Sequence, residues 1–309
     1  MRGAVISGAT GAIGRALVLE LCKNGVPVLA LLRSEARLEN LPTHPLLTVK
    51  RCALSELNAL EPDTGQKFDV FYHLAWAGTA GKARDDVTQQ IANISYAADA
   101  VLAAKRLGCS RFIGVGSQAE YGRVAGALTP ETPAFPETAY GSAKLAAGKL
   151  TGLLAAQLSL SHVWVRVLSV YGPADGEGSL ISTAIRSMLR GKAPRLTAAI
   201  QIWDYLYAAD AASALYLLGL GTVTGKVYVL GSGKARMLRE YLEELRDVVA
   251  PGLPLHFGEV AFSPKQVMHL EADIDALTRD TGWRPRISFS DGICETAAWW
   301  QAKQRECGR

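Results

Sequence analysis

The chain has few of the residues from which metal sites and disulfide frameworks are built. Its five cysteines are scattered and odd in number, no Cys-x-x-Cys pair occurs, and the five histidines form no cluster. Such counts argue against a zinc site and against a set of structural disulfides. We therefore expect a cytosolic protein with reduced thiols and no bound metal.

Charge of one sign and long apolar runs are also scarce. The 33 basic and 29 acidic residues are interspersed and leave a net charge of +4, without the basic stripe of a nucleic-acid-binding protein. Charged residues or glycines interrupt the longest apolar runs well short of a membrane span. The first predicted strand begins so close to Met1 that we expect no signal peptide. We therefore predict a cytoplasmic protein whose partners are neither membrane nor nucleic acid, and the basic excess can help to attract an anionic ligand.

What the sequence does have is a regular alternation of apolar strands and helices. The 309 residues, 49% of them apolar, suffice for one large domain or two closely joined lobes. Alternating strands and helices predict an α/β fold with a doubly wound parallel sheet. The predicted strands are Ala4–Ser7, Val26–Leu32, Leu47–Lys50, Val70–Leu74, Arg111–Gly116, His162–Arg166 and 225–230, and the predicted helices are 13–24, 87–107, 139–158, 180–190 and 238–249.

The first strand leads into a glycine-rich turn. Gly8, Gly11 and Gly14 permit a tight turn, close approach of the backbone to a pyrophosphate, and close packing of helix on strand. The N-terminus of the following helix would face the phosphates with free N–H groups and its positive dipole end. The pattern predicts a dinucleotide site, and a plain turn between strand and helix is the alternative.

Tyr140 and Lys144 stand four residues apart, so they share one face of a helix. A free tyrosine titrates near ~10, but a neighbouring ammonium favours the phenolate and lowers its pKa. The hydroxyl of Ser117 can hydrogen-bond the same substrate oxygen as Tyr140. We predict that these three residues interconvert a carbinol and a carbonyl beside a hydride carrier. For the Tyr–Lys pair alone, a surface helix with an aromatic anchor is the alternative.

Together, these motifs resemble the extended short-chain dehydrogenase/reductase family, in its nucleotide-sugar epimerase, dehydratase and reductase branch. The resemblance covers almost the whole chain and implies a Rossmann-type sheet with a smaller C-terminal substrate-binding lobe. The nucleotide-binding domain is expected over 1–172, with 203–232 returning to it, and the lobe over 173–202 and 233–309. A homodimer is also implied, formed through helices 87–107 and 139–158, although burial within the monomer is the alternative. Further matching segments are Phe71–Trp76, Asn93, Arg166, Ser169–Pro173 and Trp203–Tyr207.

The resemblance also assigns the cofactor contacts. Arg33 follows the second strand, where an acid would bind the ribose hydroxyls of NAD and an arginine suits the 2′-phosphate of NADP. NADP(H) is therefore expected in preference to NAD(H). Ala53 replaces the aspartate that usually meets the adenine, and His73 is interpreted as structural. The expected cofactor residues are Gly8, Thr10, Gly11, Ala12, Ile13, Gly14, Arg33, Leu74, Ala75, Trp76, Asn93, Tyr140 and Lys144.

By the same resemblance, the C-terminal lobe binds a nucleotide-diphosphate sugar. Ser169 stands where relatives commonly carry an asparagine near the phosphate, and Trp203 where many carry a phosphate-binding arginine. Trp203 can stack on a base or pack internally, and packing is the favoured interpretation. Possible basic replacements for the arginine are Lys265, Arg186, Arg190 and Arg195. The expected substrate-binding residues are Gln118, Ser169, Trp203 and Lys265.

Three functions fit these residues. The first is NADP(H)-dependent reduction of a nucleotide-linked 4-keto (6-deoxy) hexose, which Arg33 favours because a reductase draws on the NADPH pool. The second is a nucleotide-sugar 4-epimerase, which oxidises C4 and returns the hydride after the ketone rotates. The third, a non-catalytic NADP-binding regulator, is disfavoured by the intact Ser117, Tyr140 and Lys144. Dehydration is disfavoured because a 4,6-dehydratase carries an Asp-Glu pair where this chain has Gln118-Ala119.

Overall fold

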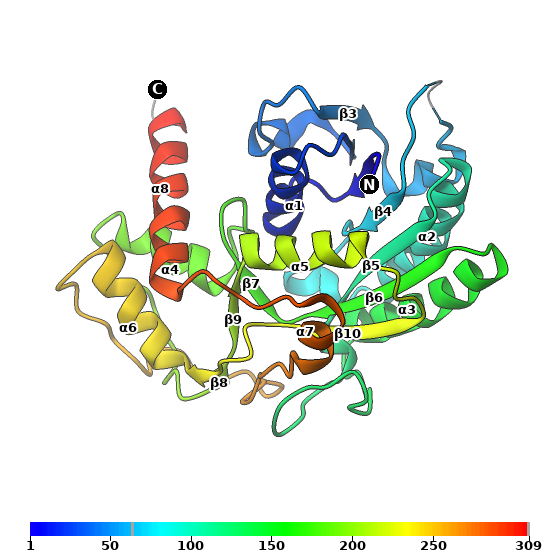
Figure 1. Ribbon diagram of the computed structural model, residues 1–309. Helices are drawn as coiled ribbons and strands as arrows, with labels where there is room; N and C mark the ends of the chain where they lie inside the picture. Colours follow the sequence, from blue (N-terminus) through cyan, green and yellow to red (C-terminus); the bar gives the residue numbers. More distant parts are fainter. Residues whose placement is uncertain (63–64, 308–309) are drawn as a thin grey trace.

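The computed structural model describes residues 1–62 and 65–307. Its centre is a sheet of seven parallel strands in the order β10-β6-β5-β4-β1-β2-β3 (Figure 1). The predicted α/β class with a parallel sheet is thereby confirmed. The strands are β1 (Ala4–Ser7), β2 (Val28–Leu32), β3 (Leu47–Arg51), β4 (Val70–His73), β5 (Arg111–Ser117), β6 (Ser161–Val167) and β10 (Lys226–Leu230).

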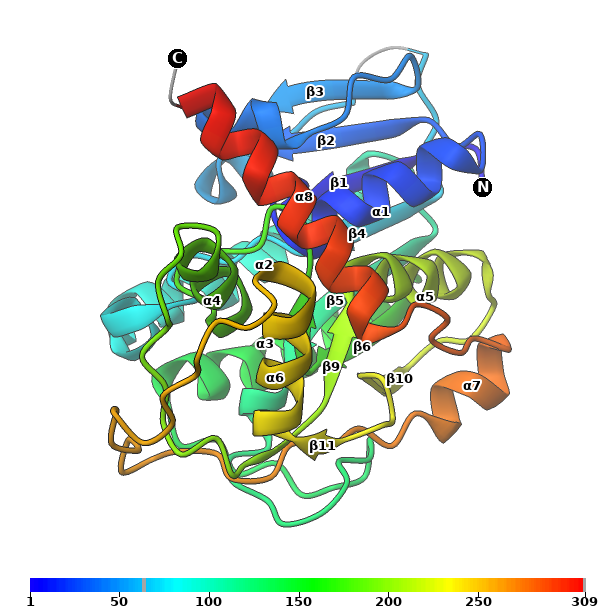
Figure 2. The ribbon, with the colours of Figure 1, turned by 90° about the vertical axis from the view of Figure 1, so that its left-hand side faces the viewer.

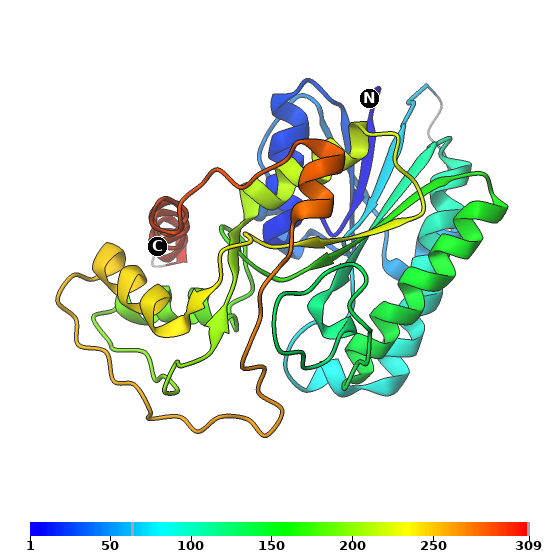
Figure 3. The same cartoon turned by 60° about the horizontal axis from the view of Figure 1, so that its bottom comes forward.

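Helices cover both faces of this sheet, because successive residues of a strand point to opposite sides. Ala4 and Ile6 of β1 pack with α1 (Ala12–Lys23) and α5 (Ala208–Leu220), whereas Val5 packs on the other face with α2 (Val87–Arg106). On that second face, α3 (Ala139–Gln157) lies beside α2, as Figures 1 and 3 show. Strands that are covered on both faces are continuously apolar, which makes them recognisable in the sequence.

A smaller lobe is built from segments that follow β6. It contains the helices α4 (Leu180–Met188), α6 (Leu238–Val249) and α8 (Phe289–Cys307), on the left in Figure 1. The side chains that these helices turn toward one another form a separate core, with Ile185, Leu242 and Trp300 among its members. Two pairs of short strands connect the lobe: β7 (Ser169–Tyr171) with β9 (Tyr205–Tyr207), and β8 (Ile202–Trp203) with β11 (Arg236–Met237).

Later segments return to the sheet domain. Within the range 203–232, α5 covers the sheet beside α1, and β10 forms an edge of the sheet. Trp203, the first residue of this range, lies in β8, outside the sheet. α7 (Asp275–Thr281) returns as well, because Leu277 and Trp283 are buried in the same core as α1 and α5. The sheet domain thus includes α7, which the expected boundary placed in the lobe.

The last helix joins the two parts of the molecule. α8 runs diagonally across them and ends near β3, as Figure 2 shows. On it, Lys303 Nζ lies 2.6 Å from Asn40 Oδ1 and 3.0 Å from Glu39 Oε1. Asn40 is buried and donates from Nδ2 to the carbonyl oxygen of Thr10 at 3.2 Å. This series of contacts connects the lobe to the glycine turn.

Candidate active site

The glycine turn after β1 has the close contacts that its sequence predicts. Gly8 has a φ of +81°, and a Cβ there would lie 2.6 Å from the backbone nitrogen of Ala75. A Cβ on Gly14 would lie only 2.1 Å from the carbonyl oxygen of Gly8, so the first turn of α1 packs directly on the loop. At Gly11 the nearest atom would be 3.9 Å away, which leaves space beside the backbone. No side chain caps the N-terminus of α1, so its N–H groups suit a pyrophosphate.

The same turn includes the other predicted phosphate-side residues. Thr10 precedes α1, and Ala12 and Ile13 are its first residues, so their backbone N–H groups lie at the helix N-terminus. The residues therefore fit a dinucleotide, because the backbone is open at Gly11 where a ligand would approach.

Arg33 lies beside this turn. Ser7 pairs with Leu31 in the parallel register of β1 and β2, which places the residues after each strand next to one another. Arg33 is exposed and forms no salt bridge within the described part of the chain. Its guanidinium is thus available for an anionic group on the ribose side of a dinucleotide.

A second wall of the site follows β4 and is held by two buried amides of α2. Leu74 donates its backbone N–H to Ser7, which aligns the segment with the glycine turn. Asn93 Oδ1 accepts from Ala77 N at 3.0 Å and Asn93 Nδ2 donates to Ala77 O at 2.9 Å. Gln90 accepts from Trp76 Nε1 at 2.8 Å. Asn93, which was expected among the cofactor residues, therefore steadies the backbone of this wall. Gln90 was not predicted because its amide is indistinguishable from a surface glutamine in sequence.

The three predicted catalytic residues come from adjacent elements. Ser117 ends β5, and Tyr140 and Lys144 lie on successive turns of α3. Thr138 caps α3 by accepting from Gly141 N at 3.0 Å. A Cβ on Gly141 would lie 2.2 Å from the carbonyl oxygen of Ala119, so the start of α3 packs directly on the turn after β5. This close packing brings Tyr140 beside Ser117, which helps to lower the pKa of the phenol.

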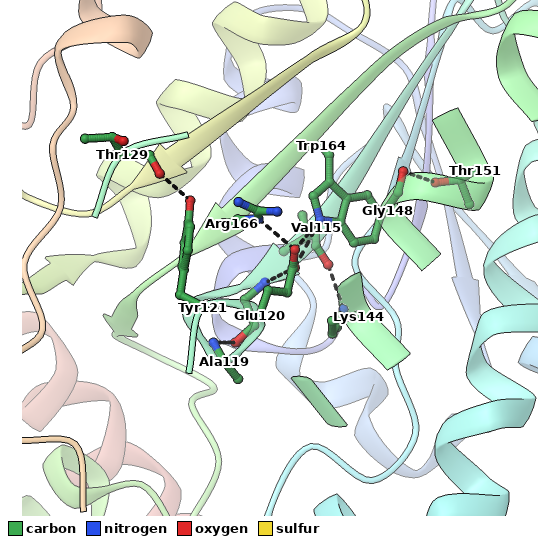
Figure 4. Close-up of polar contacts among 11 residues, drawn as sticks. Val115, Ala119, Glu120, Tyr121, Thr129, Lys144, Gly148, Thr151, Trp164 and Arg166 are labelled. Atoms are coloured by element: carbon green, nitrogen blue, oxygen red, sulfur yellow. Dashed lines mark hydrogen bonds and ion pairs between the residues drawn. The ribbon is translucent and has the colours of Figure 1, made fainter. Parts of the chain in front are cut away.

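Lys144 is a buried ammonium. Its side chain is almost completely covered, and Nζ donates to the carbonyl oxygen of Val115 at 2.6 Å (Figure 4). Nζ also lies 3.8 Å from the centroid of the Trp76 ring, a favourable cation–π contact. Burial lowers the pKa of Lys144 to about 7, and the nearby carboxylate of Glu120 opposes that change.

Tyr140 differs from its sequence-based expectation. Burial raises the pKa of Tyr140, and the hydrogen bond with Ser117 and the charge of Arg84 offset only part of that rise. The predicted fall toward neutrality, driven by Lys144, is therefore wrong for this state of the protein. Lys144 Nζ lies 6.0 Å from the Tyr140 ring centroid, whereas the guanidinium carbon of Arg84 lies 4.3 Å from it. Arg84 was not predicted, because nothing in the sequence around it indicates that it faces α3.

His73 behaves as the structural residue that was inferred. It is buried at the end of β4, and its Nδ1 lies 2.8 Å from the hydroxyl of Ser7. Burial, with a smaller contribution from the charge of Lys144, lowers the pKa of His73 to about 3. The imidazole is therefore neutral at physiological pH and links β1 to β4.

A cavity of about 460 Å³ opens between the sheet domain and the lobe. Its lining begins at Leu168 and Ser169, directly after Val167, which pairs in register with Ser117. It continues along β7, the start of α4, the segment 195–201 and α6. The cavity therefore extends from the end of β6, beside the end of β5 that carries Ser117, into the lobe.

The cavity brings together some of the predicted substrate residues. Ser169 and Trp203 line it and are hydrogen-bonded to each other, with Trp203 Nε1 2.8 Å from Ser169 Oγ. Gln118 lies in the turn after β5, and Lys265 Nζ is 3.5 Å from the carbonyl oxygen of Glu137; neither of the two lines this cavity.

Further polar residues line the cavity, among them Arg195 and Gln201. Arg195, one of four candidate basic residues, has an exposed side chain whose Nε lies 3.9 Å from Glu259 Oε2, and Arg186 is paired with Glu177 at 2.8 Å. Gln201 was not predicted. Its buried Oε1 has no hydrogen-bond partner among the described residues. A buried amide without a partner is costly, so Gln201 is suited to hydrogen-bond a ligand.

Residues 1–62 and 65–307 contain neither a membrane-spanning helix nor a metal-binding cluster. No helix there is long and apolar enough to cross a membrane. In the same ranges, no group of three or more His, Cys, Asp or Glu side chains is arranged to hold a metal ion.

The buried charge of Lys144 predicts a pH-dependent stability. Its pKa falls from an ordinary 10.5 to about 7 on folding, so the unfolded chain holds the proton more tightly. Wild-type stability attributable to this group therefore rises as pH increases from about 7 to 10.5 and is lowest below pH 7. Lys144→Met lacks this dependence. We expect its stability relative to wild type to fall by roughly 2–4 kcal/mol between pH 6.5 and pH 10.

Chemical denaturation of both proteins across this pH range measures the difference, in which the contributions of groups that do not interact with Lys144 cancel. Lys149→Met is the matched control, because it removes an exposed lysine from the same helix without removing a buried charge. A stability difference between wild type and Lys144→Met that is the same at every pH would contradict the inferred burial of the ammonium.

Comparison with known proteins agrees with this geometry. The sequence profile of the NAD dependent epimerase/dehydratase family matches residues 4–231. The dTDP-glucose 4,6-dehydratase of Neisseria gonorrhoeae is 26% identical over 327 residues, which cover 96% of this chain and 94% of that enzyme. The enzyme of the same name from Streptomyces niveus is 28% identical over 202 residues, which cover 64% of this chain and 60% of the relative.

Solved structures of epimerases share the fold. A UDP-N-acetylglucosamine 4-epimerase from Methanobrevibacter ruminantium M1, in complex with UDP-N-acetylmuramic acid, superposes with a TM-score of 0.88 at 22% identity, covering 98% of this chain and 99% of that one. A UDP-glucuronic acid 4-epimerase from Bacillus cereus in complex with NAD gives 0.84 at 21% identity, covering 99% and 98%. Because the family profile spans most of the chain and includes the glycine turn, Ser117, Tyr140 and Lys144, the protein belongs to the NAD dependent epimerase/dehydratase family, within the extended short-chain dehydrogenase/reductases.

Proposed function

We propose that this enzyme reduces a nucleotide-linked 4-keto-6-deoxyhexose at C4, with NADPH as the preferred reductant. The observation that carries the proposal is the exposed Arg33 beside the glycine turn. A guanidinium there favours the 2′-phosphate of NADP over the free hydroxyl of NAD. A cofactor drawn from the NADPH pool is consumed and replaced at each turnover, which suits a cytosolic reductase better than an enzyme that recycles its own cofactor.

The residues of the site have complementary roles in this reaction. The bound dinucleotide supplies a hydride to the 4-keto carbon of the sugar. Tyr140 donates its phenolic proton to the carbonyl oxygen as that oxygen gains charge, and Ser117 holds the same oxygen. Lys144 then stabilises the phenolate that remains on Tyr140. Because burial raises the pKa of Tyr140, its phenol is protonated at neutral pH, as a proton donor must be.

Dehydration at C5–C6 does not fit the residues after Ser117. Gln118 and Ala119 cannot move a proton, and they occupy the places of the acid pair expected of a 4,6-dehydratase. The carboxylate of Glu120, one position later, is fully buried and hydrogen-bonded to Arg166 and Trp164. It is therefore unavailable to a sugar, even though curated relatives carry the name of dTDP-glucose 4,6-dehydratases.

A nucleotide-sugar 4-epimerase is the second candidate. It needs the same three catalytic residues and returns the hydride to the opposite face of C4. The favouring observation is that similar solved structures are named 4-epimerases, some of them in complex with NAD. Under this alternative, NAD(H) would be the cofactor, and Arg33 would be a solvated residue at the end of β2.

We also propose where the nucleotide part of the substrate binds and where a second subunit makes contact. The nucleotide diphosphate occupies the cavity lined by Ser169, Trp203, Arg195 and Gln201. Gln118 and Lys265, which lie outside that lining, are proposed to contact other parts of the substrate. The exposed apolar side chains of α2 and α3 form the contact between the two subunits of a homodimer. These side chains are Val87, Ile91, Leu150 and Leu153, which are 51–65% exposed.

Removal of the Arg33 guanidinium tests the cofactor preference. We expect wild type to bind NADPH more tightly than NADH by roughly 1–3 kcal/mol, because one charge-assisted contact with phosphate is gained. Arg33→Ala should lose most of this preference by weakening NADPH binding alone. Titrations of both cofactors by tryptophan fluorescence or calorimetry measure the change.

The control is Arg279→Ala, an exposed arginine on α7, which packs with β10 at the sheet edge opposite β2. Its affinities for both cofactors should match those of wild type. Equal affinities of the wild-type protein for the two cofactors would contradict the proposed preference for NADP(H).

Two substrate challenges distinguish reduction from epimerisation. In the first, purified protein receives NADPH and a panel of nucleotide-4-keto-6-deoxyhexoses, and oxidation is followed by the loss of nicotinamide absorbance. In the second, it receives UDP-glucose, UDP-galactose or their N-acetyl forms with only catalytic NAD, and the C4 epimer is sought by chromatography. We expect turnover in the first challenge and none in the second. Epimer formation without NADPH oxidation would replace the reductase with the epimerase.

A further inference from the structure

Glu120 is a buried carboxylate directly behind the catalytic residues. It ends the short 3₁₀ turn Gln118–Glu120 after β5, and its side chain has no exposed surface. A Cβ on Gly116 would lie 2.2 Å from Glu120 Oε1, so the carboxylate fills the space that glycine leaves at β5. Burial of an ionised group is costly unless it is paired, so its partners indicate what it does.

Four hydrogen bonds hold the carboxylate, and Figure 4 shows the network. Oε1 accepts from Ser117 N at 2.8 Å and from Trp164 Nε1 at 3.0 Å. Oε2 accepts from Arg166 Nε at 2.7 Å and from Trp164 Nε1 at 3.2 Å. Ser117 Oγ in turn accepts from Ala119 N at 3.2 Å, so the turn is closed from both ends in the manner of a capping box. The backbone that carries the Ser117 hydroxyl is therefore fixed by Glu120.

Lys144 is surrounded by groups from several elements. The groups that face it are the carbonyl of Val115 from β5, the Trp76 ring from the segment after β4, neutral His73 from β4, Tyr140 from its own helix and the Trp164 ring from β6. The charged residues adjoining this set are Glu120, Arg166 bound to it, and Arg84 over Tyr140. Within this group of residues, Glu120 carries the only negative charge.

We propose that Glu120 is a positioning residue of the reaction, which keeps the buried Lys144 protonated through its charge and fixes Ser117 through its main-chain hydrogen bond. The inference rests on the proposed function of Ser117, Tyr140 and Lys144. Desolvation favours the neutral amine of Lys144, and the carboxylate opposes this effect. Arg166 offsets part of that charge but also holds the carboxylate in place. Without Glu120, Lys144 would lose its proton at a pH where the enzyme must work.

The test is a pH titration of Lys144 in Glu120→Gln. The titration is monitored by NMR of protein labelled with ¹³C at the lysine ε-carbon. The Lys144 signal is assigned by its absence from Lys144→Met. Glutamine keeps an acceptor for Ser117 N while removing the charge. We expect the titration midpoint of Lys144 to fall by about one pH unit or more in this variant, a tenfold loss of ammonium near neutrality. Glu240→Gln, an exposed change on α6, should leave the midpoint where it is in wild type.

A second variant covers the possibility that Arg166 left without its partner unfolds the protein. Glu120→Gln/Arg166→Gln removes both charges of the buried pair together, which avoids an unpaired buried arginine. The Lys144 midpoint should fall in this protein too, since the carboxylate is the charge that raises it. Glu120→Asp, which keeps the charge, should restore most of the shift. A midpoint unchanged from wild type in either folded Gln variant, or loss of the fold in both, would overturn the proposal and leave Glu120 a purely structural residue.

Turnover measurements distinguish a failure of the proposed Glu120 role from a failure of the proposed reaction. In Glu120→Gln, the alkaline limb of the rate profile should move to lower pH together with the Lys144 midpoint, by about one unit. If Glu120→Gln shifted the Lys144 midpoint but the wild-type protein reduced none of the keto sugars, the electrostatic role of Glu120 would be supported and the proposed reaction would be wrong. If the reduction required Tyr140 but Glu120→Gln changed neither the pH–rate profile nor the Lys144 midpoint, the proposed reaction would stand and the electrostatic role of Glu120 would be overturned.

Discussion

The site depends on a single ammonium group held away from water. Lys144 is inserted between β5 and the wall after β4, where it has one backbone acceptor, one aromatic ring and one nearby carboxylate to balance the loss of its hydration. Burying such a charge is unfavourable, so the fold must supply each of these partners at a fixed place. The buried ammonium lowers stability, but solvent screens its charge only weakly, so it acts strongly on neighbouring groups such as Tyr140.

The surrounding elements are arranged to meet that requirement. Gly116 and Gly141 allow the carboxylate of Glu120 and the start of α3 to approach the backbone more closely than any side chain would permit. The amides of Gln90 and Asn93 fix the segment that presents Trp76 to Lys144. The catalytic geometry is thus set by packing and buried hydrogen bonds on rigid strands and helices, which is the condition for electrostatic preorganisation.

The sequence predicted what depends on local pattern. The strands of the sheet, the helices α1, α2, α3, α4 and α6, the glycine turn and the family were predicted and are confirmed, because strand and helix periodicity and the Gly8–Gly14 spacing lie within short stretches. The helices α5, α7 and α8 were not predicted. Features that depend on distant contacts were missed: Glu120 meets Arg166 from 46 residues away, and Gln201 is significant only because a cavity forms around it. The pKa of Tyr140 was predicted in the wrong direction, because its burial outweighs the charges around it and burial is a property of the whole fold.

The measurement that bears most directly on the site is the turnover of Tyr140→Phe with the sugar nucleotide that wild type accepts. Phenylalanine fills the same space between Trp76 and Arg84 but carries no proton. The variant should fold and bind NADPH as wild type does, and its kcat should fall by roughly 10²–10⁴-fold, the usual value of a positioned acid. A Tyr140→Phe enzyme that turns over within a few-fold of wild type would show that the proton comes from another group, and that the buried charge of Lys144 serves some other purpose.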